Sequence, residues 1–371
     1  MDYEVIIPDY ANNILGVPNS ILAYFGAGPR HATLPALDEK LRRGYKNIVL
    51  YVLDGMGSDV LKRHAPDGFL ARGRVSDISS VYPCTTVSAL TTFETGLTPI
   101  EHGWLGWAQY FDEIGKSVEL FTNKESGTER SVSDEFIAWK TVGFKNLFSQ
   151  IREADPSIEC CRVSPFGEYK SETNEDVCAH IGALCKKGGR RYIYAYHFQP
   201  DKDMHETGCD SERVKADVVL FDAQIEKLAA GLTDTLLIVT ADHGLNNIKM
   251  RMIEDYPEIY DCLSAPPTRE PRSLSFFVKD AMKKDFPAIW KKYFGDSFIF
   301  MTGDEAYESA YFGGGTPHAR SRGFLGDYAA FATKDIAVWF RDEKNRIADY
   351  KGMHAGLCRS EMIVPLILIE R

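Results

Sequence analysis

Several short runs of hydrophobic residues end abruptly at polar residues along this chain. Residues 47–53 (NIVLYVL) are followed by Asp54, and residues 235–240 (TLLIVT) are followed, after one alanine, by Asp242. A third run, residues 192–196 (YIYAY), also leads into a polar segment. Short apolar runs without alternation are typical of strands that are buried on both faces of a parallel sheet. The pattern therefore predicts a sheet whose strands deliver polar side chains to one edge.

Helical patterns separate these runs, for example at residues 210–232. Strands that alternate with helices indicate βαβ units, so we expect an α/β fold with a doubly wound, mostly parallel sheet. Residues 362–369 (MIVPLILI) predict a last strand. Pro365 within it favours an edge position or a bulge, because proline cannot donate a hydrogen bond to a neighbouring strand.

The pattern changes in the stretch 247–324. This stretch contains charged and proline-bearing segments and three consecutive glycines at 313–315, and it sustains no strand alternation. We interpret it as a smaller inserted cap subdomain, with residues 1–246 and 325–371 forming the core. A second weakly patterned stretch, about 111–140, is a further candidate for a loop region on the substrate side.

The charge composition argues against nucleic acids and anionic membranes as partners. The 371 residues include 43 Lys and Arg against 53 Asp and Glu, which gives a net charge of −10. Without a Lys/Arg-rich run, the chain offers no clustered cations to a nucleic-acid polymer or to an anionic membrane surface. The N-terminus lacks the cationic start and long apolar stretch of a signal peptide, and no apolar run is long enough to cross a bilayer. We therefore expect a cytoplasmic protein, and the oligomeric state stays open.

Three carboxylates and three histidines stand near the ends of the predicted strands: Asp54, Asp201, His205, Asp242, His243 and His354. Six such groups are enough for two three-ligand metal sites, and mixed His/Asp ligation suits Zn²⁺ or Mn²⁺. None of the eight cysteines forms a CxxC pair, which argues against a structural zinc site. Asp201 and His205 share one side if a helical turn begins after Pro200. Asp242 and His243 both reach a metal only if the strand has ended, which Gly244 permits.

A predicted helix begins close to Thr86. Val87, Leu90 and Phe93 recur at helical spacing, and Gly96 stands where a helix C-cap belongs. Free backbone N–H groups and the positive end of the dipole at a helix N-terminus favour an anion, such as a threonine alkoxide or a bound phosphoryl group. A metal bound to the hydroxyl would lower its pKa further and generate a nucleophile.

Taken together and in this order, these motifs resemble the alkaline phosphatase superfamily, most closely its type I phosphodiesterase/nucleotide pyrophosphatase branch. The motif islands cover about residues 45–110, 190–247 and 350–370. They are Asp54 after a strand, Thr86 with Gly96, Pro99, His102 and Gly103, Asp201-x-x-x-His205-x-x-Gly208, Thr240-Ala241-Asp242-His243-Gly244, and His354-Ala355-Gly356 with Glu361-Met362-Ile363-Val364-Pro365-Leu366.

The resemblance implies a dinuclear-metal-dependent phosphoric ester hydrolase. One metal would be held by Asp201, His205 and His354. The other would be held by Asp54, Asp242 and His243, with the oxygen of Thr86 as a further ligand. The two divalent ions would be Zn²⁺ in first place, with Mn²⁺ as the alternative. The reaction would be a double displacement through a phospho-threonine on Thr86, which the spacing to Gly96 favours over Thr85.

Two departures from the branch bear on the substrate. Val87 follows the threonine where the branch has a phenylalanine that packs on a base, and Trp107 stands where it has a phosphate-binding asparagine. We expect a small phosphorylated substrate, a phosphodiester or pyrophosphate as in the branch. The departures favour the alternatives of a phosphomonoesterase or a phosphonate hydrolase, and a non-catalytic metal- or nucleotide-binding sensor is a further alternative. Trp107, His318 and Arg322 are the candidate substrate-binding residues, whereas His102 reads as a structural, hydrogen-bonded histidine.

Overall fold

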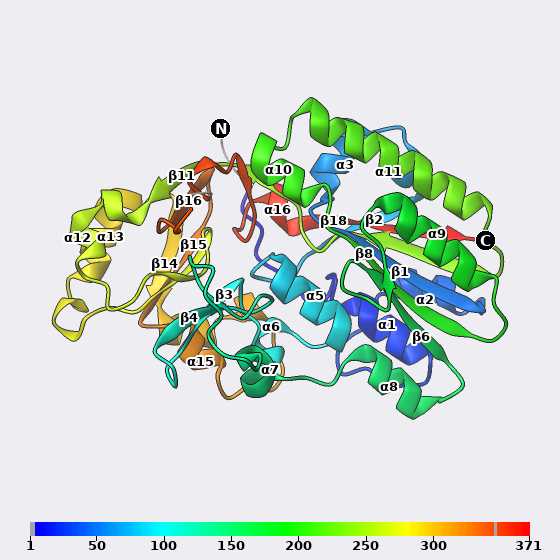
Figure 1. The fold of residues 1–371 in the computed structure, drawn as a ribbon, viewed down its shortest axis with the longest axis horizontal. Coiled ribbons are helices and arrows are strands. Elements are labelled where there is room, and N and C mark those ends of the chain that lie inside the picture. Colours follow the sequence, from blue (N-terminus) through cyan, green and yellow to red (C-terminus); the bar gives the residue numbers. More distant parts are fainter. Residues whose placement is uncertain (1–3, 345–346) are drawn as a thin grey trace.

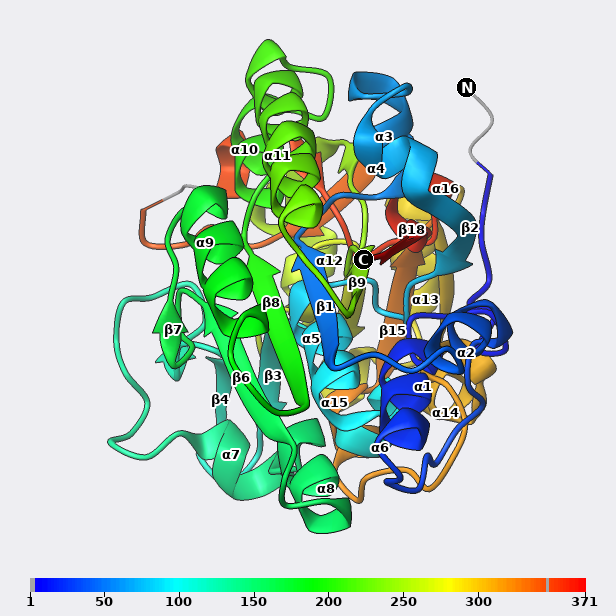
Figure 2. The same cartoon turned by 90° about the vertical axis from the view of Figure 1, so that its right-hand side faces the viewer.

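The computed structural model describes residues 4–344 and 347–371. The first three residues, which belong to the segment where no signal peptide was expected, lie outside the described residues. The core is a seven-stranded sheet (Figures 1 and 2). Its strands, in spatial order, are β2 (Arg74–Ser79), β18 (Ile363–Glu370), β9 (Thr235–Thr240), β1 (Asn47–Leu53), β8 (Arg191–His197), β6 (Glu159–Ser164) and β7 (Tyr169–Lys170).

The sheet is mostly parallel, as predicted. Strands β9, β1, β8, β6 and β7 run parallel to one another, and only β18 runs antiparallel to its neighbours β9 and β2. All four strands that the hydrophobic runs predict are present. β18 is an interior strand, so the edge interpretation of Pro365 is wrong, but the register shifts between Leu366 and Ile367 next to it. The bulge that proline favours is therefore present.

Helices cover both faces of this sheet, which confirms the doubly wound arrangement (Figure 1). One face carries α3 (Ser58–His64), α4 (Phe69–Gly73), α9 (Asn174–Cys185) and α11 (Glu212–Ala230). The other carries α1 (Gly16–Tyr24), α5 (Thr86–Thr95) and α8 (Leu147–Ala154), with α2 (Pro35–Leu41) beside α1. The predicted helix at 210–232 is α11, which begins after Ser211, whose side chain accepts a hydrogen bond from Val214 N.

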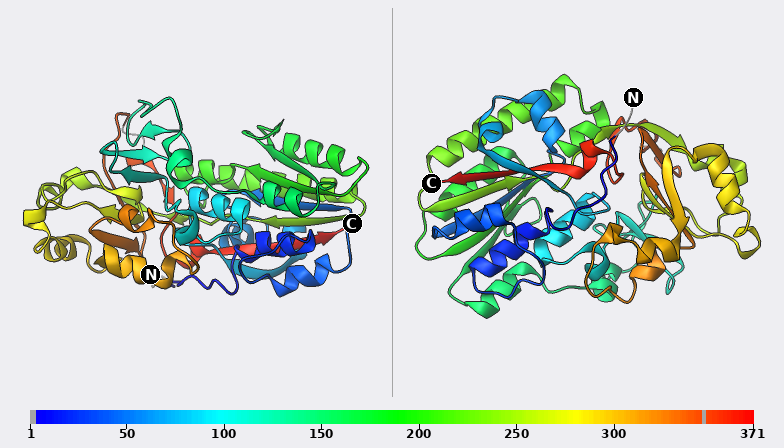
Figure 3. Two further views of the ribbon diagram at one scale, coloured as in Figure 1. Left: turned by 90° about the horizontal axis from the view of Figure 1, so that it is seen from below. Right: turned by 180° about the vertical axis from the view of Figure 1, so that it is seen from behind.

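A second seven-stranded sheet, wholly antiparallel, forms the cap. Figure 3 shows it at the end of the molecule opposite the C-terminus. Its strands, in spatial order, are β14 (Phe298–Thr302), β15 (Tyr328–Ala332), β13 (Ser273–Phe276), β12 (Thr268–Glu270), β3 (Ala108–Phe111), β4 (Lys116–Glu119) and β5 (Lys124–Glu125). Its helices are α7 (Ile137–Val142), α12 (Pro257–Tyr260), α13 (Phe286–Phe294), α14 (Gly303–Glu308) and α15 (Ser321–Phe324).

The cap sheet extends beyond the expected insertion at 247–324 on both sides. It takes β3–β5 from the stretch 108–125, which overlaps the region at about 111–140 considered as a substrate-side loop, and β15 from 328–332. The strand YAAFA has no polar and apolar alternation, and the alternation of SLSF spans only four residues, so neither identifies a strand clearly in the sequence.

The loops at the carboxyl ends of the core strands meet the cap. A buried apolar cluster that includes Tyr82, Val87, Trp104, Phe331 and Leu357 joins the two parts. Two small sheets lie beside it, β10 (Asn246–Asn247) with β17 (Gly352–Met353) and β11 (Lys249–Met252) with β16 (Ile336–Trp339). Three short helices, α6 (Pro99–His102), α10 (Asp201–Thr207) and α16 (Arg359–Met362), complete the junction. Among the described residues, no helix has both the length and the apolar composition needed to cross a bilayer.

Candidate active site

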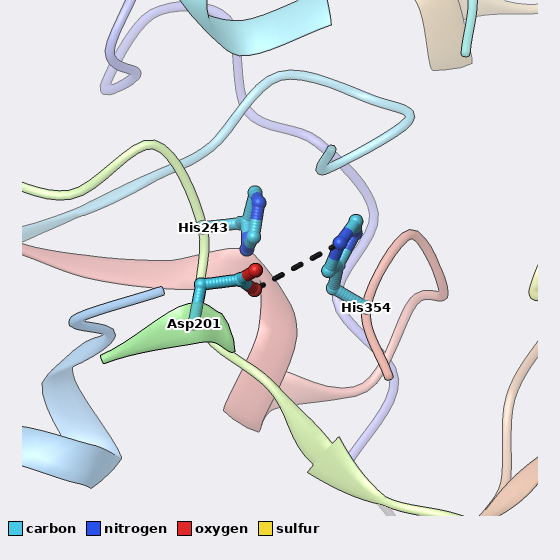
Figure 4. A group of neighbouring side chains, drawn as sticks. All are labelled: Asp201, His243 and His354. Carbon is cyan, nitrogen blue, oxygen red and sulfur yellow. Dashed lines mark ion pairs between the residues drawn. The ribbon is translucent and has the colours of Figure 1, made fainter. Parts of the chain in front are cut away.

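The polar residues predicted at the strand ends converge at one edge of the core sheet. Asp54 follows β1, and the helix α10 begins directly after Pro200, past the end of β8. This turn places His205 Nε2 3.2 Å from Asp201 Oδ2, as the i, i+4 spacing predicts. His354 arrives from the loop before β18, with Nε2 3.9 Å from Asp201 Oδ1 (Figure 4).

Asp54, Asp242 and His243 form a second, buried group. His243 Nε2 lies 3.5 Å from both Asp54 Oδ1 and Asp242 Oδ2. The backbone N–H groups of Gly55 and His243 donate to Asp242 Oδ1, at 3.1 and 3.0 Å, and so orient this carboxylate. Nδ1 of His243 lies 3.1 Å from the Gly244 carbonyl, so a proton on Nδ1 leaves Nε2 free to bind a metal.

His243 lies between the two groups. Ligand atoms of Asp201, His243 and His354 lie within 4.8 Å of one another, as do those of Asp54, Asp242 and His243. In Figure 4 the polar atoms of the first group turn toward one another, and the ring centroids of His243 and His354 are 4.0 Å apart. His205 contacts Asp201 directly, and its Nδ1 lies 2.8 Å from the Gly352 carbonyl. The division of the histidines between two metals stays a prediction.

The donor set fits divalent cations, because buried polar atoms in it have no hydrogen bond. Within the described part of the chain, Asp54 Oδ1, Asp201 Oδ1, Asp242 Oδ2 and His354 Nδ1 are buried without a hydrogen bond. An unpaired buried acceptor costs free energy that a bound cation would offset. Carboxylates and imidazoles without thiolates are a donor set typical of Zn²⁺ or Mn²⁺.

The pKa values of the three carboxyl groups are also shifted by their surroundings. Burial, reinforced by the charge of Asp242, raises the pKa of Asp54 well above its usual value. Burial also raises the pKa of Asp242. Burial opposes ionisation of Asp201 as well, but the charges of His205 and His354 outweigh it and hold the pKa of this carboxyl below its usual range. Burial and the neighbouring carboxylates therefore penalise the ionised forms of Asp54 and Asp242, and bound cations would offset this penalty.

Thr86 faces this cluster, whereas Thr85 does not. Thr86 is the first residue of α5 and the single residue between 78 and 93 that is not fully buried. Its Oγ1 lies 3.5 Å from Asp54 Oδ2 and 3.3 Å from His243 Nε2. The Thr85 hydroxyl instead donates to Glu270 Oε1, at 2.6 Å. The geometry thus favours Thr86 over Thr85 as the residue whose hydroxyl faces the carboxylate and histidine cluster.

Sequence reasoning missed two residues beside the cluster. The Tyr196 hydroxyl, on β8, donates to Asp54 Oδ2. Glu270, on the cap strand β12, accepts from the Thr85 hydroxyl and from the Trp107 N–H at 2.7 Å, and burial raises the pKa of Glu270 to about 7. Tyr196 could have been noticed because it directly precedes the polar end of its strand. For Glu270, the sequence shows only a charged residue before a proline.

The three candidate substrate-binding residues lie around the cap. The ring of Trp107 is half-buried against Phe121, at a centroid distance of 6.1 Å. The backbone N–H of His318 donates to the Ile100 carbonyl, and Arg322 pairs with Asp304 at 2.6 Å within the cap. Their role in substrate binding stays a prediction.

His102 has the structural role that we expected for it. It is buried, and its Nδ1 accepts from the Trp104 N–H at 3.0 Å. Burial lowers its pKa to about 3, so the imidazole is neutral at physiological pH.

The family comparison assigns this chain, with its doubly wound sheet, to the hydrolases of the alkaline phosphatase superfamily. Within it, the protein belongs to the type I phosphodiesterase/nucleotide pyrophosphatase family, whose model matches residues 48–265. The members of this family are phosphoric ester hydrolases. No curated protein shows a significant sequence match over the chain.

Solved structures support the fold assignment. Human ectonucleotide pyrophosphatase/phosphodiesterase 5 has a TM-score of 0.65 and 15% identity, covering 87% of each chain. An inactive threonine-to-alanine variant of the murine protein, in complex with AMP, has a TM-score of 0.63 and 15% identity, covering 86% of this chain and 87% of that one. Phosphonoacetate hydrolase from Sinorhizobium meliloti 1021, in complex with phosphonoformate, has a TM-score of 0.63 and 15% identity, covering 88% and 90%.

Proposed function

We propose that this protein is a dinuclear-metal-dependent phosphoric ester hydrolase that works through a phospho-threonine on Thr86. The observation that carries the proposal is the placement of Thr86. Thr86 is partly exposed at the start of α5, and its hydroxyl faces Asp54 and His243 at 3.5 and 3.3 Å. The inactive threonine-to-alanine form of the murine neighbour is consistent with a threonine nucleophile in this fold.

Two cations, Zn²⁺ in first place or Mn²⁺, would be held by the carboxylates and histidines of the cluster, with Asp201, His205 and His354 around one and Asp54, Asp242, His243 and Thr86 around the other. When bound, they supply positive charge that lowers the pKa of a nearby hydroxyl and offsets the charge of a phosphoryl group.

The N-terminus of α5 and the Thr86 hydroxyl would bind and attack the phosphoryl group. α5 presents its N-terminus to the phosphoryl site, and no side chain in the described part of the chain caps it, because the Thr85 hydroxyl is bound to Glu270. Its free N–H groups can therefore bind phosphoryl oxygens. Thr86 Oγ1 attacks phosphorus, the ester oxygen leaves with a proton, and water then cleaves the phospho-threonine and restores the hydroxyl.

The proposed substrate is a small phosphodiester or pyrophosphate. The family match supports it, and the AMP complex of the murine neighbour shows that this fold accommodates a nucleotide. A phosphomonoester or phosphonate is the second candidate. Trp107 stands where the branch has a phosphate-binding asparagine, and its backbone N–H cannot replace that donor because it is bound to Glu270. The phosphonoacetate hydrolase also shares the fold.

The test compares bis-p-nitrophenyl phosphate with p-nitrophenyl phosphate, each with added Zn²⁺ or Mn²⁺. We expect metal-dependent turnover of the diester, and acid quenching during turnover should leave the phosphoryl group, with its remaining ester substituent, on Thr86 in peptide mass spectra. Turnover of the monoester alone would select the second candidate. Inactivity on both, with metals bound, would contradict catalysis and favour a sensor.

A further inference from the structure

The turn between β12 and β13 is buried between the cap and the core. Glu270 pairs with Ser273 across the hairpin, so Pro271 and Arg272 form its turn. Turns normally lie at the surface because their backbone groups need water. Here both turn residues are buried, and Arg272 is 0% exposed. The tip of the hairpin therefore inserts into the body of the protein and carries charged side chains with it.

On one side, the hairpin tip holds the start of α5. Glu270 is 2% exposed, and its Oε1 accepts from the Thr85 hydroxyl at 2.6 Å and from the Trp107 N–H at 2.7 Å. Thr85 is the N-cap of α5, a position whose hydroxyl usually accepts from the helix's own N–H groups. Its engagement with Glu270 fixes the backbone one residue before Thr86.

On the other side, the tip holds the loop that carries His354. Arg272 donates from Nε and Nη2 to the two oxygens of Glu361, each at 2.6 Å. Glu361 in turn accepts from the N–H groups of Gly356 and Cys358, at 2.9 and 3.3 Å. The loop between His354 and Glu361 is thus tied to the cap by this buried ion pair, in addition to the hydrogen bond from the Leu357 N–H to the Ala332 carbonyl of β15.

The backbone next to His354 needs such support. Ala355 has φ +81°, a conformation that costs free energy for a residue with a side chain. A Cβ at Gly356 would lie 2.6 Å from Arg272 Nη2, so the guanidinium packs directly against this loop. A strained backbone persists only where its surroundings hold it, and Arg272 with Glu361 provides that restraint.

We propose that the tip of the β12–β13 hairpin is the positioning device of the active site, with Glu270 setting the place of Thr86 and Arg272, through Glu361, that of His354. The proposal rests on the roles proposed above for Thr86 and His354. Reacting groups must be held within a fraction of an ångström, and a displacement of about 1 Å can cost roughly a hundredfold in rate. The cap would then be part of the catalytic framework as well as a wall of the substrate site.

Glu270 is tested by a pair of variants. Glu270→Ala removes the acceptor, and we expect kcat to fall roughly tenfold to a hundredfold while KM and bound metal stay unchanged. Glu270→Gln keeps an oxygen that accepts both hydrogen bonds and should restore most of kcat. The matched control is Glu305→Ala, which removes a carboxylate that accepts from the hydroxyl and the N–H of Thr302, the N-cap of α14, in exposed hydrogen bonds. A wild-type kcat in Glu270→Ala, or equal losses in Ala and Gln, would overturn this part.

Arg272 is tested by metal affinity, which needs no turnover. Arg272→Lys keeps the charge but loses the two-pronged contact with Glu361, so we expect Zn²⁺ to bind roughly tenfold more weakly in competition with a chromophoric chelator. The control is Arg341→Lys, which weakens an exposed pair with Asp255. If Arg272→Lys does not fold, the double variant Arg272→Met with Glu361→Gln removes both charges and should show the same loss. Unchanged Zn²⁺ affinity in the folded variant would contradict the proposal.

Thr86→Ala separates failure of this proposal from failure of the proposed function. If Thr86→Ala is inactive while the Glu270 and Arg272 variants behave as wild type, the positioning proposal fails and the proposed function stands. If Thr86→Ala turns over at the wild-type rate, the proposed nucleophile is wrong. The Zn²⁺ affinity of Arg272→Lys still decides the His354 part in that case.

Discussion

Removal of divalent cations should destabilise the fold, because the cluster buries acceptors that a cation would pair. Asp54 Oδ1, Asp201 Oδ1, Asp242 Oδ2 and His354 Nδ1 are buried without hydrogen bonds in the described part of the chain. Each unpaired buried group costs about 1–3 kcal/mol. Exhaustive chelation followed by thermal unfolding, with and without Zn²⁺ added back, measures how much of this penalty the metal relieves.

The size of the shift follows from ligand linkage. A site filled at a hundred times its dissociation constant adds about 2.7 kcal/mol to the free energy of unfolding, so two sites add about 5.4 kcal/mol. At about 2.1 cal/mol/K of unfolding entropy per residue, a chain of 371 residues unfolds with ~0.8 kcal/mol/K, and the expected rise in Tm is about 7 °C.

A matched pair of variants makes this prediction specific. Asp242→Asn should lose a large part of the Zn²⁺-dependent shift, because Asp242 belongs to the cluster. Asp222→Asn should keep the full shift, because Asp222 accepts from the N–H groups of Phe69 and Leu70 at the start of α4. A Tm that stays the same with and without Zn²⁺, or equal shifts in the two variants, would refute the reasoning.

Three further predictions concern single side chains. Thr86→Ala should abolish turnover while elemental analysis still finds about two metal ions per chain, and undiminished activity would remove Thr86 from the mechanism. Tyr196→Phe removes the hydroxyl that donates to Asp54, so Zn²⁺ should bind roughly tenfold more weakly in a chelator competition; unchanged affinity would show that this contact does not orient the carboxylate. Burial lowers the pKa of His102 from 6.5 to about 3, so the unfolded chain binds the extra proton first and stability falls as the pH drops below 6.5. The wild type should lose about 1.4 kcal/mol per pH unit more than His102→Gln between pH 6 and 4 in urea unfolding, and parallel curves would contradict the burial argument.

Local patterns predicted the parts of the protein that depend on neighbouring residues. The runs before Asp54 and Asp242 indicated buried strands, and parallel strands bring their carboxyl ends to one edge. The turn after Pro200 predicted the contact of Asp201 with His205, which the structure places at 3.2 Å. The carboxylates and the Asp242–His243 pair could therefore be placed from strand ends, whereas Thr86 followed from a helix start and His354 from a loop.

Contacts across long stretches of chain could not be predicted in this way. Glu270 meets Thr85 from 185 positions away, and Arg272 meets Glu361 from 89. Neither partner has a local pattern that indicates the other. The cap strands were missed for a different reason, since YAAFA has no polar residue to alternate with its apolar ones and the alternation of SLSF is only four residues long.

The strands of the cap sheet come from separate parts of the chain, which limits how the chain can be divided into modules. Arg269 pairs with Ala108, and β13 pairs with β15, so the sheet is assembled from segments that enter and leave the core separately. No single excision releases the cap as an autonomous module. A chain truncated at residue 246 would leave the β3 edge unpaired and open to intermolecular strand addition. Exchange of substrate specificity between relatives is therefore better attempted by grafting individual loops than by transplanting the cap as a block.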